Sequence, residues 1–266
     1  MKSKIISVIN QKGGVGKTTT VINLAAGLAK NNKKILVIDL DPQGNATTGL
    51  GHSNTDGSEK NIYNALNGSK DISEITQSTG IKNLDIITSN VDLSGLEVET
   101  AGDNGRAFIL RDKLSFFLKE NNSKYTHVFI DCPPSLSLLT VMALVASNSL
   151  IVPLQTEFFA LEGLTQLIKT IDRVKENLNS QLSIRGIVLT MYDKRNKLSG
   201  QVEKEARDYF KEKVYSTVIP RNVRLSEAPS HGIPVLVYDK TCLGSKSYFN
   251  FTEEFLNKEE NFESAA

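Results

Sequence analysis

Residues 12–19 carry the side chains best suited to hold a polyphosphate, in the order Lys-Gly-Gly-Val-Gly-Lys-Thr-Thr. The three glycines allow backbone N–H groups to turn inward around phosphate oxygens, and a helix that starts here adds the positive end of its dipole. Lys17 is expected to reach the β- and γ-phosphates, and the Thr18 hydroxyl to bind Mg²⁺. The residues predicted to contact the nucleotide are Lys12, Gly13, Gly14, Val15, Gly16, Lys17, Thr18 and Thr19.

This loop departs from the general phosphate-loop pattern G-x-x-x-x-G-K-[ST], which requires a glycine where this chain has Gln11. Residues 16–18 keep Gly-Lys-Thr in place, and Lys12 adds a second lysine at the front. A glycine-rich turn with a lysine nearby is the simpler alternative. The apolar run at residues 5–9 favours the phosphate loop, because a strand, a loop and a helix are the context that this motif needs.

Carboxylates follow two further apolar runs. Asp39 ends the run that begins at residue 35, and Asp131 ends the run that begins at residue 128. Carboxylates at the carboxyl ends of parallel strands face the ligand crevice, and Mg²⁺ takes one or two of them while keeping several waters. Asp41 lies two residues beyond Asp39, where the chain is free to approach a terminal phosphate. The alternative for Asp41 is a turn cap before Pro42.

The elements that must position these residues can be recognised by short apolar runs rich in β-branched residues. Continuous runs of this kind suit strands buried on both faces of a parallel sheet, and helical spacing separates them, as at Leu161, Leu164, Ile168 and Ile171. We therefore predict an α/β fold with a doubly wound, mostly parallel sheet flanked by helices. The runs are 5–9, 35–38, 84–87, 128–130, 150–152, 184–189 and 214–219.

The domain organisation follows from length. A chain of 266 residues suits one large α/β domain, assigned here to residues 1–257, and the acidic residues 258–266 are expected to form a disordered tail. The two cysteines fit a reducing cytoplasm better than a disulfide scaffold. No apolar run approaches the roughly 18 residues of a membrane span, so a cytoplasmic protein is expected.

A basic segment stands out in a chain whose net charge is only +1. Residues 194–224 contain nine Lys and Arg against four Asp and Glu, a balance of +5, so the remainder is net acidic. Such asymmetry is expected of a surface that binds nucleic-acid phosphates. The alternative is a solvated helix face, because basic and acidic residues alternate between positions 203 and 213. We therefore favour the arginines that lie in predicted loops, namely Arg195, Arg221 and Arg224.

Three segments in this order and spacing resemble the ParA/Soj/MinD group of deviant Walker A ATPases. They are the loop at 12–19, the segment 34–45 with Asp-Pro-Gln-Gly-Asn, and the segment 128–135 with Asp-Cys-Pro-Pro-Ser. The sequence around Asp-Pro-Gln-Gly-Asn resembles the ParA/Soj partition ATPases in particular. So does Pro-Arg-Asn-Val-Arg-Leu-Ser-Glu-Ala-Pro-Ser at 220–230. The resemblance covers about residues 1–257.

The resemblance implies an ATPase that uses ATP/ADP and Mg²⁺. Asp131 would be the Walker B aspartate that holds Mg²⁺ through water, together with Thr18, and Asp39 would support that shell or the Thr18 hydroxyl. Asp41 would position the attacking water. Lys12 would reach across an ATP-dependent homodimer to the partner's phosphates, in the manner of an arginine finger, although a solvated lysine is the usual fate of this side chain.

The resemblance also implies where the base and the DNA bind. Pro220 and Asn222 would hold adenine, and Arg195, Arg221 and Arg224 would bind nonspecific double-stranded DNA. A ParB/Spo0J-like partner would stimulate hydrolysis, and the protein would be cytoplasmic and nucleoid-associated, serving chromosome or plasmid partition. Whether the cargo is a chromosome, a plasmid or another structure stays open.

Two alternative functions make different demands on the sequence. A MinD-like membrane ATPase would end in a basic amphipathic helix, whereas this chain carries Glu253, Glu254, Glu259 and Glu260 near its end, which anionic headgroups would repel. No membrane partner is therefore expected. A reductase of the nitrogenase iron protein type would need cysteines to bridge an iron–sulfur cluster, but Cys132 and Cys242 lack the flanking pattern, and a buried, inert Cys132 is favoured.

Overall fold

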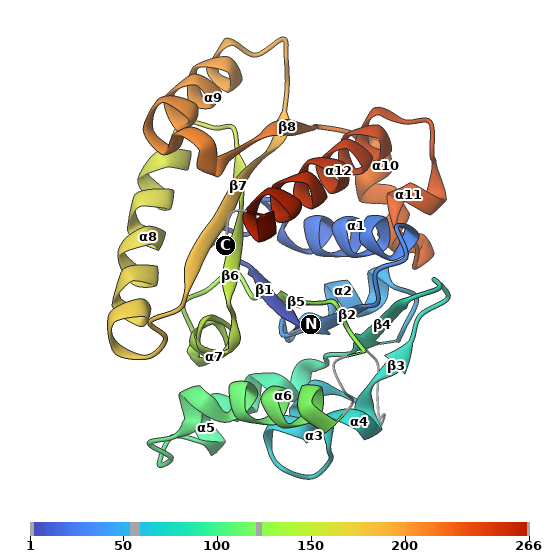
Figure 1. Cartoon of the computed structure of the whole chain (residues 1–266), viewed down its shortest axis with the longest axis vertical. Coiled ribbons are helices and arrows are strands. Elements are labelled where there is room, and N and C mark those ends of the chain that lie inside the picture. Colours follow the sequence, from blue (N-terminus) through green and yellow to red (C-terminus); the bar gives the residue numbers. More distant parts are fainter. Residues whose placement is uncertain (1–2, 54–58, 121–123, 265–266) are drawn as a thin grey trace.

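The computed structural model of the chain describes residues 3–53, 59–120 and 124–264, with side chains described as far as residue 259 (Figure 1). An eight-stranded sheet has the order β3-β4-β2-β5-β1-β6-β7-β8. Neighbouring strands are parallel except for the edge pair β3–β4, so the predicted fold class is confirmed. The strands are β1 (Lys4–Val8), β2 (Ile35–Asp39), β3 (Gln77–Ser78), β4 (Leu84–Ile87), β5 (His127–Asp131), β6 (Ser149–Gln155), β7 (Ser183–Tyr192) and β8 (Val214–Pro220).

Helices cover both faces of this sheet, which is why its central strands are apolar throughout (Figure 1). One face packs against α1 (Lys17–Lys30), α2 (Asn45–Gly49), α10 (Val223–Glu227), α11 (Val235–Tyr238) and α12 (Leu243–Ser264). The other packs against α3 (Ile62–Leu66), α4 (Ile72–Ile75), α5 (Leu96–Glu99), α6 (Ile109–Glu120), α7 (Leu138–Ala146), α8 (Ala160–Asn177) and α9 (Lys197–Phe210). Short 3-10 helices lie at Val91–Gly95, Arg106–Phe108, Lys211–Lys213 and Ala228–His231.

Each apolar run predicted as a strand overlaps a strand of the structure, and the helix expected near Lys17 begins at that residue. The sequence patterns did not predict β3. This strand has only two residues, both polar, and it forms by antiparallel pairing with β4 at the edge of the sheet. Nothing so short leaves an alternating or continuous apolar pattern.

The register of the central strands sets up the crevice. Asp131 of β5 pairs with Val8 of β1 on one side and with Asp39 of β2 on the other. The three strands therefore end at the same level, and the loop that follows β1 leaves the sheet beside the two carboxylates. Both β2 and β5 are buried along their whole length, so these carboxylates are buried as well.

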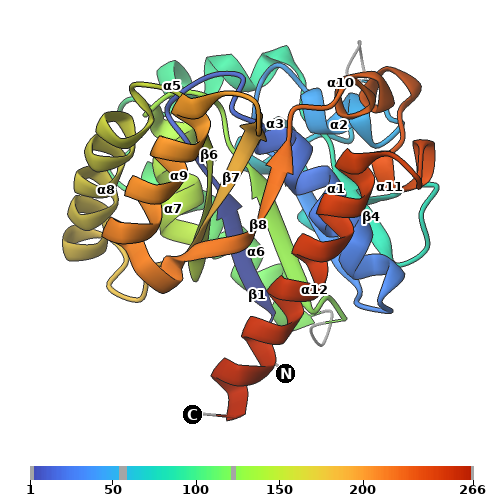
Figure 2. The same cartoon turned by 90° about the horizontal axis from the view of Figure 1, so that it is seen from above.

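The last helix continues beyond the point where the sequence suggested a tail. Helix α12 runs to Ser264, and its final turns project past the other helices (Figure 2). Glu259 is buried there, with Oε2 2.9 Å from His127 Nε2, and it forms an ion pair with Arg185 at 2.6 Å. Residues 258 and 259 are thus part of the folded unit, while residues 265 and 266 lie outside the described residues. The assignment of a single domain ending at residue 257 stays a prediction.

Candidate nucleotide site

The glycine-rich loop joins Val8 at the end of β1 to Lys17 at the start of α1. Gly14 and Gly16 adopt φ angles of 75° and 90°, in the left-handed region that side chains disfavour. Gly16 is the N-cap of α1 and offers no side-chain cap, so the first N–H groups of the helix stay available to a ligand. The loop therefore leaves backbone N–H groups free at the start of α1, and its binding of phosphate stays a prediction.

Lys17 points back over this loop. Its side chain is nearly buried, at 6% exposed, and Nζ donates a hydrogen bond of 3.0 Å to the carbonyl of Lys12. Burial lowers the pKa of Lys17, and the negative charges of Asp131 and Asp41 oppose that shift. An ammonium group that is held in a glycine-lined loop and bonded to a neutral carbonyl is placed to exchange that partner for phosphate oxygens.

Asp131 and Thr18 form the centre of the site. The Thr18 hydroxyl donates to Asp131 Oδ2 at 2.7 Å, while Asp131 Oδ1 is buried and has no hydrogen-bond partner among the described residues. Burial, and next the charge of Asp39, raise the pKa of Asp131 well above its usual range. An orphaned carboxylate oxygen beside a threonine hydroxyl fits Mg²⁺, which prefers oxygen ligands and would relieve the cost of the buried charge.

Asp39 accepts hydrogen bonds from residues that follow it in the chain, and not from Thr18. Oδ2 accepts from both the N–H and the hydroxyl of Thr47, each at 2.7 Å, and Oδ1 accepts from the Asp41 N–H at 3.2 Å. Burial raises the pKa of Asp39 to about 6, against the lowering effect of these hydrogen bonds. The Thr18 hydroxyl, which was one expected contact of Asp39, donates to Asp131 instead. A supporting role for Asp39 near Mg²⁺ stays a prediction.

Asp41 lines the main cavity of the site. This cavity has a volume of about 460 Å³ and is bordered by Gly13, Gly14, Gly16, Lys17, Thr18, Thr19, Asp41, Gln43, Asn45, Thr48, Pro134, Met191, Pro229 and Ser230. Asp41 Oδ1 also accepts from the Gln43 N–H at 3.0 Å. Asp41 thus borders the cavity and also caps the turn at Pro42, while its approach to a terminal phosphate stays a prediction.

A second cavity of about 220 Å³ adjoins the first. Both are bordered by Gly16, Thr19, Met191 and Pro229, and the second adds Pro220, Arg221 and Asn222 from the loop after β8. The Asn222 side-chain oxygen accepts from the Arg224 N–H at 3.0 Å, so the amide nitrogen is the group left to meet a base. The structure thus brings the predicted adenine residues next to the phosphate loop.

The Lys12 side chain turns away from the main cavity. Its ammonium group forms an ion pair with Glu157, which follows β6, and 53% of the side chain is exposed. The Lys12 carbonyl accepts the hydrogen bond from Lys17, and the Lys12 N–H donates to Asn10 Oδ1 at 3.0 Å. The backbone of Lys12 therefore belongs to the loop, while its charge lies outside the site of its own subunit.

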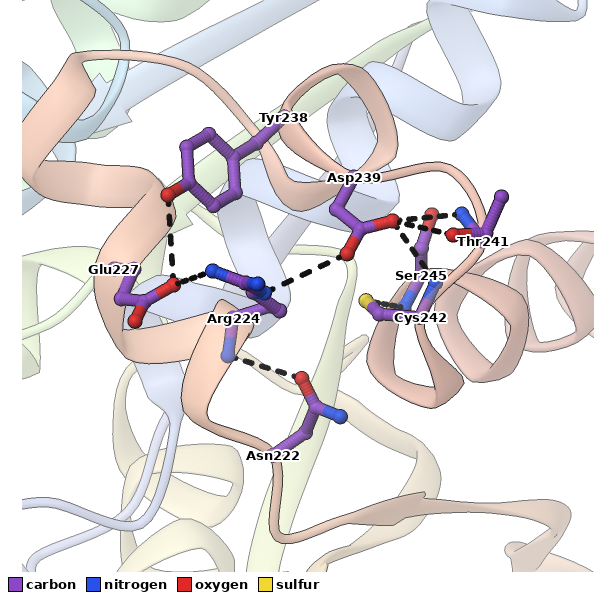
Figure 3. A network of polar contacts seen from close by, with 8 residues as sticks. All are labelled: Asn222, Arg224, Glu227, Tyr238, Asp239, Thr241, Cys242 and Ser245. Atoms are coloured by element: carbon purple, nitrogen blue, oxygen red, sulfur yellow. Dashed lines mark hydrogen bonds and ion pairs between the residues drawn. The ribbon is translucent and has the colours of Figure 1, made fainter.

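The three candidate DNA-binding arginines follow the neighbouring strands β7 and β8, whose ends pair at Tyr192 and Pro220. Arg195 is 91% exposed and forms a two-point contact with Asp193. Arg224 lies between Glu227, at 2.6 Å, and Asp239, at 3.6 Å (Figure 3). The arginines lie on segments that leave adjoining strands, but Arg195 and Arg224 already have carboxylate partners.

Several residues of the site were not predicted from the sequence. Thr47 was missed because its contact with Asp39 depends on how α2 packs. Met191 has a φ of 51°, unusual for a residue with a side chain, and lines both cavities without any sequence signal. Pro229 and Ser230 could have been found, since they belong to the segment 220–230 that carries the resemblance.

The structure also bears on the alternative that requires cysteines to hold an iron–sulfur cluster. Cys132 is fully buried, and burial raises the pKa of its thiol, as expected for an inert cysteine. Across residues 3–53, 59–120 and 124–264, no helix is both long and apolar enough to span a membrane.

Comparison with known proteins agrees with this geometry. The model of the AAA domain family matches residues 3–184. The chromosome partitioning protein ParA of Caulobacter vibrioides is 49% identical over 99% of this chain and 97% of its own. The sporulation initiation inhibitor protein Soj of Bacillus subtilis is 48% identical over 94% of this chain and 97% of its own.

Among solved structures, cobyrinic acid a,c-diamide synthase from Mycobacterium smegmatis, crystallised with ADP and magnesium, is similar with a TM-score of 0.82. It is 31% identical and covers 97% of this chain and 96% of its own. These relatives match nearly the whole chain, and they agree with the fold, the glycine-rich loop and the buried Asp131. The chain therefore belongs to the ParA/Soj family of partition ATPases.

Proposed function

We propose that this protein is an ATPase that dimerises on ATP, binds DNA without sequence preference and acts in chromosome or plasmid partition. The observation that carries the proposal is the buried Asp131 Oδ1, which has no partner among the described residues and belongs to a carboxylate that accepts from the Thr18 hydroxyl and interacts with the charge of Lys17. The group that fits there is a divalent cation with a polyphosphate. The relatives from Caulobacter and Bacillus are named for partitioning and sporulation control, and the Mycobacterium smegmatis structure holds ADP and magnesium.

ATP and ADP would bind along the two adjoining cavities. The phosphates would lie on the loop from Lys12 to Thr19, and the base would lie against Pro220 and Asn222. Thr18 and Asp131, supported by Asp39, would hold Mg²⁺, which neutralises phosphate charge when bound. Asp41 borders the cavity and would position the attacking water. Phosphoryl transfer needs such positioning and charge neutralisation more than strong basicity.

ATP would also be the switch for assembly. The Lys12 ammonium lies outside its own cavity, with Glu157 as its partner, so it is available to a second subunit once that ion pair opens. A half-exposed ion pair of this kind contributes about 1 kcal/mol or less, so opening it is a small cost. In the homodimer, Lys12 of each subunit would approach the phosphates held by the other.

DNA binding would follow dimerisation, because one subunit offers few phosphate contacts and two offer twice as many. Arg195 and Arg221 are the stronger candidates, because Arg195 is 91% exposed with Asp193 as its carboxylate partner, whereas Arg224 is 50% exposed between two carboxylates. A ParB/Spo0J-like partner would stimulate hydrolysis and release the dimer from the nucleoid. Co-sedimentation with ATP separates this function from a MinD-like one: plasmid DNA should pellet the protein, and anionic liposomes should not.

Substitution of the two lysines of the loop should have different effects on nucleotide binding and on dimerisation. Lys17→Ala removes the charge nearest the β- and γ-phosphates and should abolish nucleotide binding, measured by calorimetry. Lys12→Ala should retain nucleotide binding and lose ATP-dependent dimerisation, measured by size-exclusion chromatography with light scattering. Glu157→Gln is the matched control, because it breaks the same ion pair, keeps the lysine and should still dimerise. Equal loss of nucleotide affinity in both lysine variants would refute the role of Lys12 across the interface.

Asp41→Ala should leave ATP bound but unhydrolysed, because Asp41 borders the cavity without being the partner of the Thr18 hydroxyl. The variant should accumulate as an ATP-bound dimer, and phosphate release should fall to background. Since Asp41 also accepts from the Gln43 N–H, Asp41→Asn, which can keep that turn, should behave in the same way. Hydrolysis at the normal rate in either variant would show that Asp41 does not position the water.

Substitution of the arginines should alter the salt dependence of DNA binding. Removing one phosphate interaction with duplex DNA lowers the slope of log affinity against log salt by about 0.9, so a residue present twice per dimer should lower it by roughly 2. We expect this for Arg195→Ala on unrelated DNA sequences, with dimerisation unchanged. Arg224→Ala should have a smaller effect, because the Arg224 guanidinium is already engaged by Glu227 and Asp239 and is less available to a phosphate.

Arg111→Ala is the matched control for these variants, since Arg111 is an exposed arginine paired with Asp112 on α6. It should leave both affinity and slope unchanged. If the triple variant of Arg195, Arg221 and Arg224 still dimerises with ATP and binds DNA with normal affinity and slope, DNA binds elsewhere. Nucleotide affinity must be measured alongside, because Arg221 borders the second cavity.

A further inference from the structure

Thr190 makes a contact with the phosphate loop that the nucleotide chemistry above does not use. It lies near the carboxyl end of β7 and is 2% exposed. Its hydroxyl donates a hydrogen bond of 2.8 Å to the carbonyl of Val15. Thr190 is itself fixed by the sheet, since it pairs with Gln155 of β6 and its carbonyl accepts from the Thr156 N–H at 3.3 Å. A rigid strand therefore holds one carbonyl of a glycine-rich loop.

The position of that carbonyl decides where the next N–H points. The peptide unit between Val15 and Gly16 is planar and trans, so its C=O and N–H point in opposite directions. The carbonyl accepts from Thr190, which borders the second cavity, so the Gly16 N–H of the same unit points away from Thr190. Gly16 also borders the main cavity, which Thr190 does not line.

The Val15–Gly16 peptide unit depends on contacts from outside the loop to fix its orientation, because the loop around it is rich in glycine. Gly14 and Gly16 both have positive φ angles, and glycine is the residue with the most conformations to lose. The methyl carbon of Thr190 lies 3.8 Å from the point where a Gly16 side chain would begin, so the Thr190 side chain lies beside Gly16 as well as bonding to Val15. One side chain therefore lies against both residues of this peptide unit.

The hydrogen bond from Lys17 is a second contact that fixes the loop, and phosphate oxygens would compete for the donors of the same ammonium group. Lys17 Nζ donates to the Lys12 carbonyl with one of its three N–H groups. Thr190 does not line the main cavity, although it borders the second one, so its bond to the Val15 carbonyl is separate from the contacts that Lys17 makes with phosphates. It can therefore keep the Gly16 N–H directed at a phosphate when the loop is loaded.

We propose that Thr190 is a positioning residue of the phosphate loop, whose hydroxyl holds the Val15 carbonyl and so directs the Gly16 N–H at a phosphate of the nucleotide. The inference rests on the proposed function, in that the cavity takes a nucleoside di- or triphosphate. Thr190 touches no reacting atom in this role. It acts by removing the alternative orientations of one peptide unit before the ligand arrives.

The test compares Thr190→Val, Thr190→Ser and the unchanged protein. Thr190→Val keeps the branched shape but cannot donate, so ADP affinity with Mg²⁺ should fall roughly three- to tenfold, the effect of one neutral hydrogen bond. Thr190→Ser keeps the donor and should restore most of that affinity. Adenosine, which has no phosphate, should bind with equal affinity to all three proteins, because Thr190 borders the second cavity without a proposed polar contact to the base. Thr76→Val is the matched control, because it removes a threonine bond to a carbonyl far from the loop.

Each outcome has a distinct meaning. Unchanged ADP affinity in Thr190→Val would overturn the positioning role and leave the proposed function intact. An equal loss for adenosine, or no recovery in Thr190→Ser, would also overturn it, because the effect would then come from the base site or from packing. Failure of the unchanged protein to bind ADP would overturn the proposed function together with this inference.

Discussion

The burial of Asp131 at the end of β5 is the constraint around which the site is arranged. The carboxylate has lost its water, one oxygen is satisfied by Thr18, and the other has no partner in the described part of the chain. Its raised pKa means that the ionised form opposes folding at neutral pH, where an unfolded chain would ionise it freely. A cation that binds only the folded protein recovers that cost, so stability and ligand binding are linked at this residue.

The rest of the fold places other polar side chains of the site around the Asp131 carboxylate. Parallel pairing brings Asp39 to the same level as Asp131, and the loop after β1 carries Lys17 and Thr18 to them. Strands β7 and β8 then bring Met191 and Asn222 to the neighbouring cavity. Residues far apart in the chain meet because all of these strands are parallel and end on one side of the sheet.

Much of this could be predicted from the sequence, because the patterns are local. The apolar runs show the buried strands, and the spacing of glycines and lysines in residues 12–19 shows the loop. The partners of individual side chains could not be predicted, since they depend on tertiary packing. Thr47 rather than Thr18 donates to Asp39, Glu157 pairs with Lys12, and Asp239 lies beside Arg224. Composition also gave no sign that α12 extends past residue 257 or that Glu259 pairs with Arg185 there.

The central claim is that Asp131 and Thr18 form a Mg²⁺–nucleotide site, and the most direct measurement is ATP affinity with and without Mg²⁺ in the unchanged protein and in Asp131→Asn. Asparagine can still accept from Thr18 but carries no charge, so the free variant should be at least as stable as the original protein. The account predicts that Mg²⁺ strengthens ATP binding in the unchanged protein and that most of this gain is lost in Asp131→Asn. An equal gain from Mg²⁺ in both proteins would contradict it.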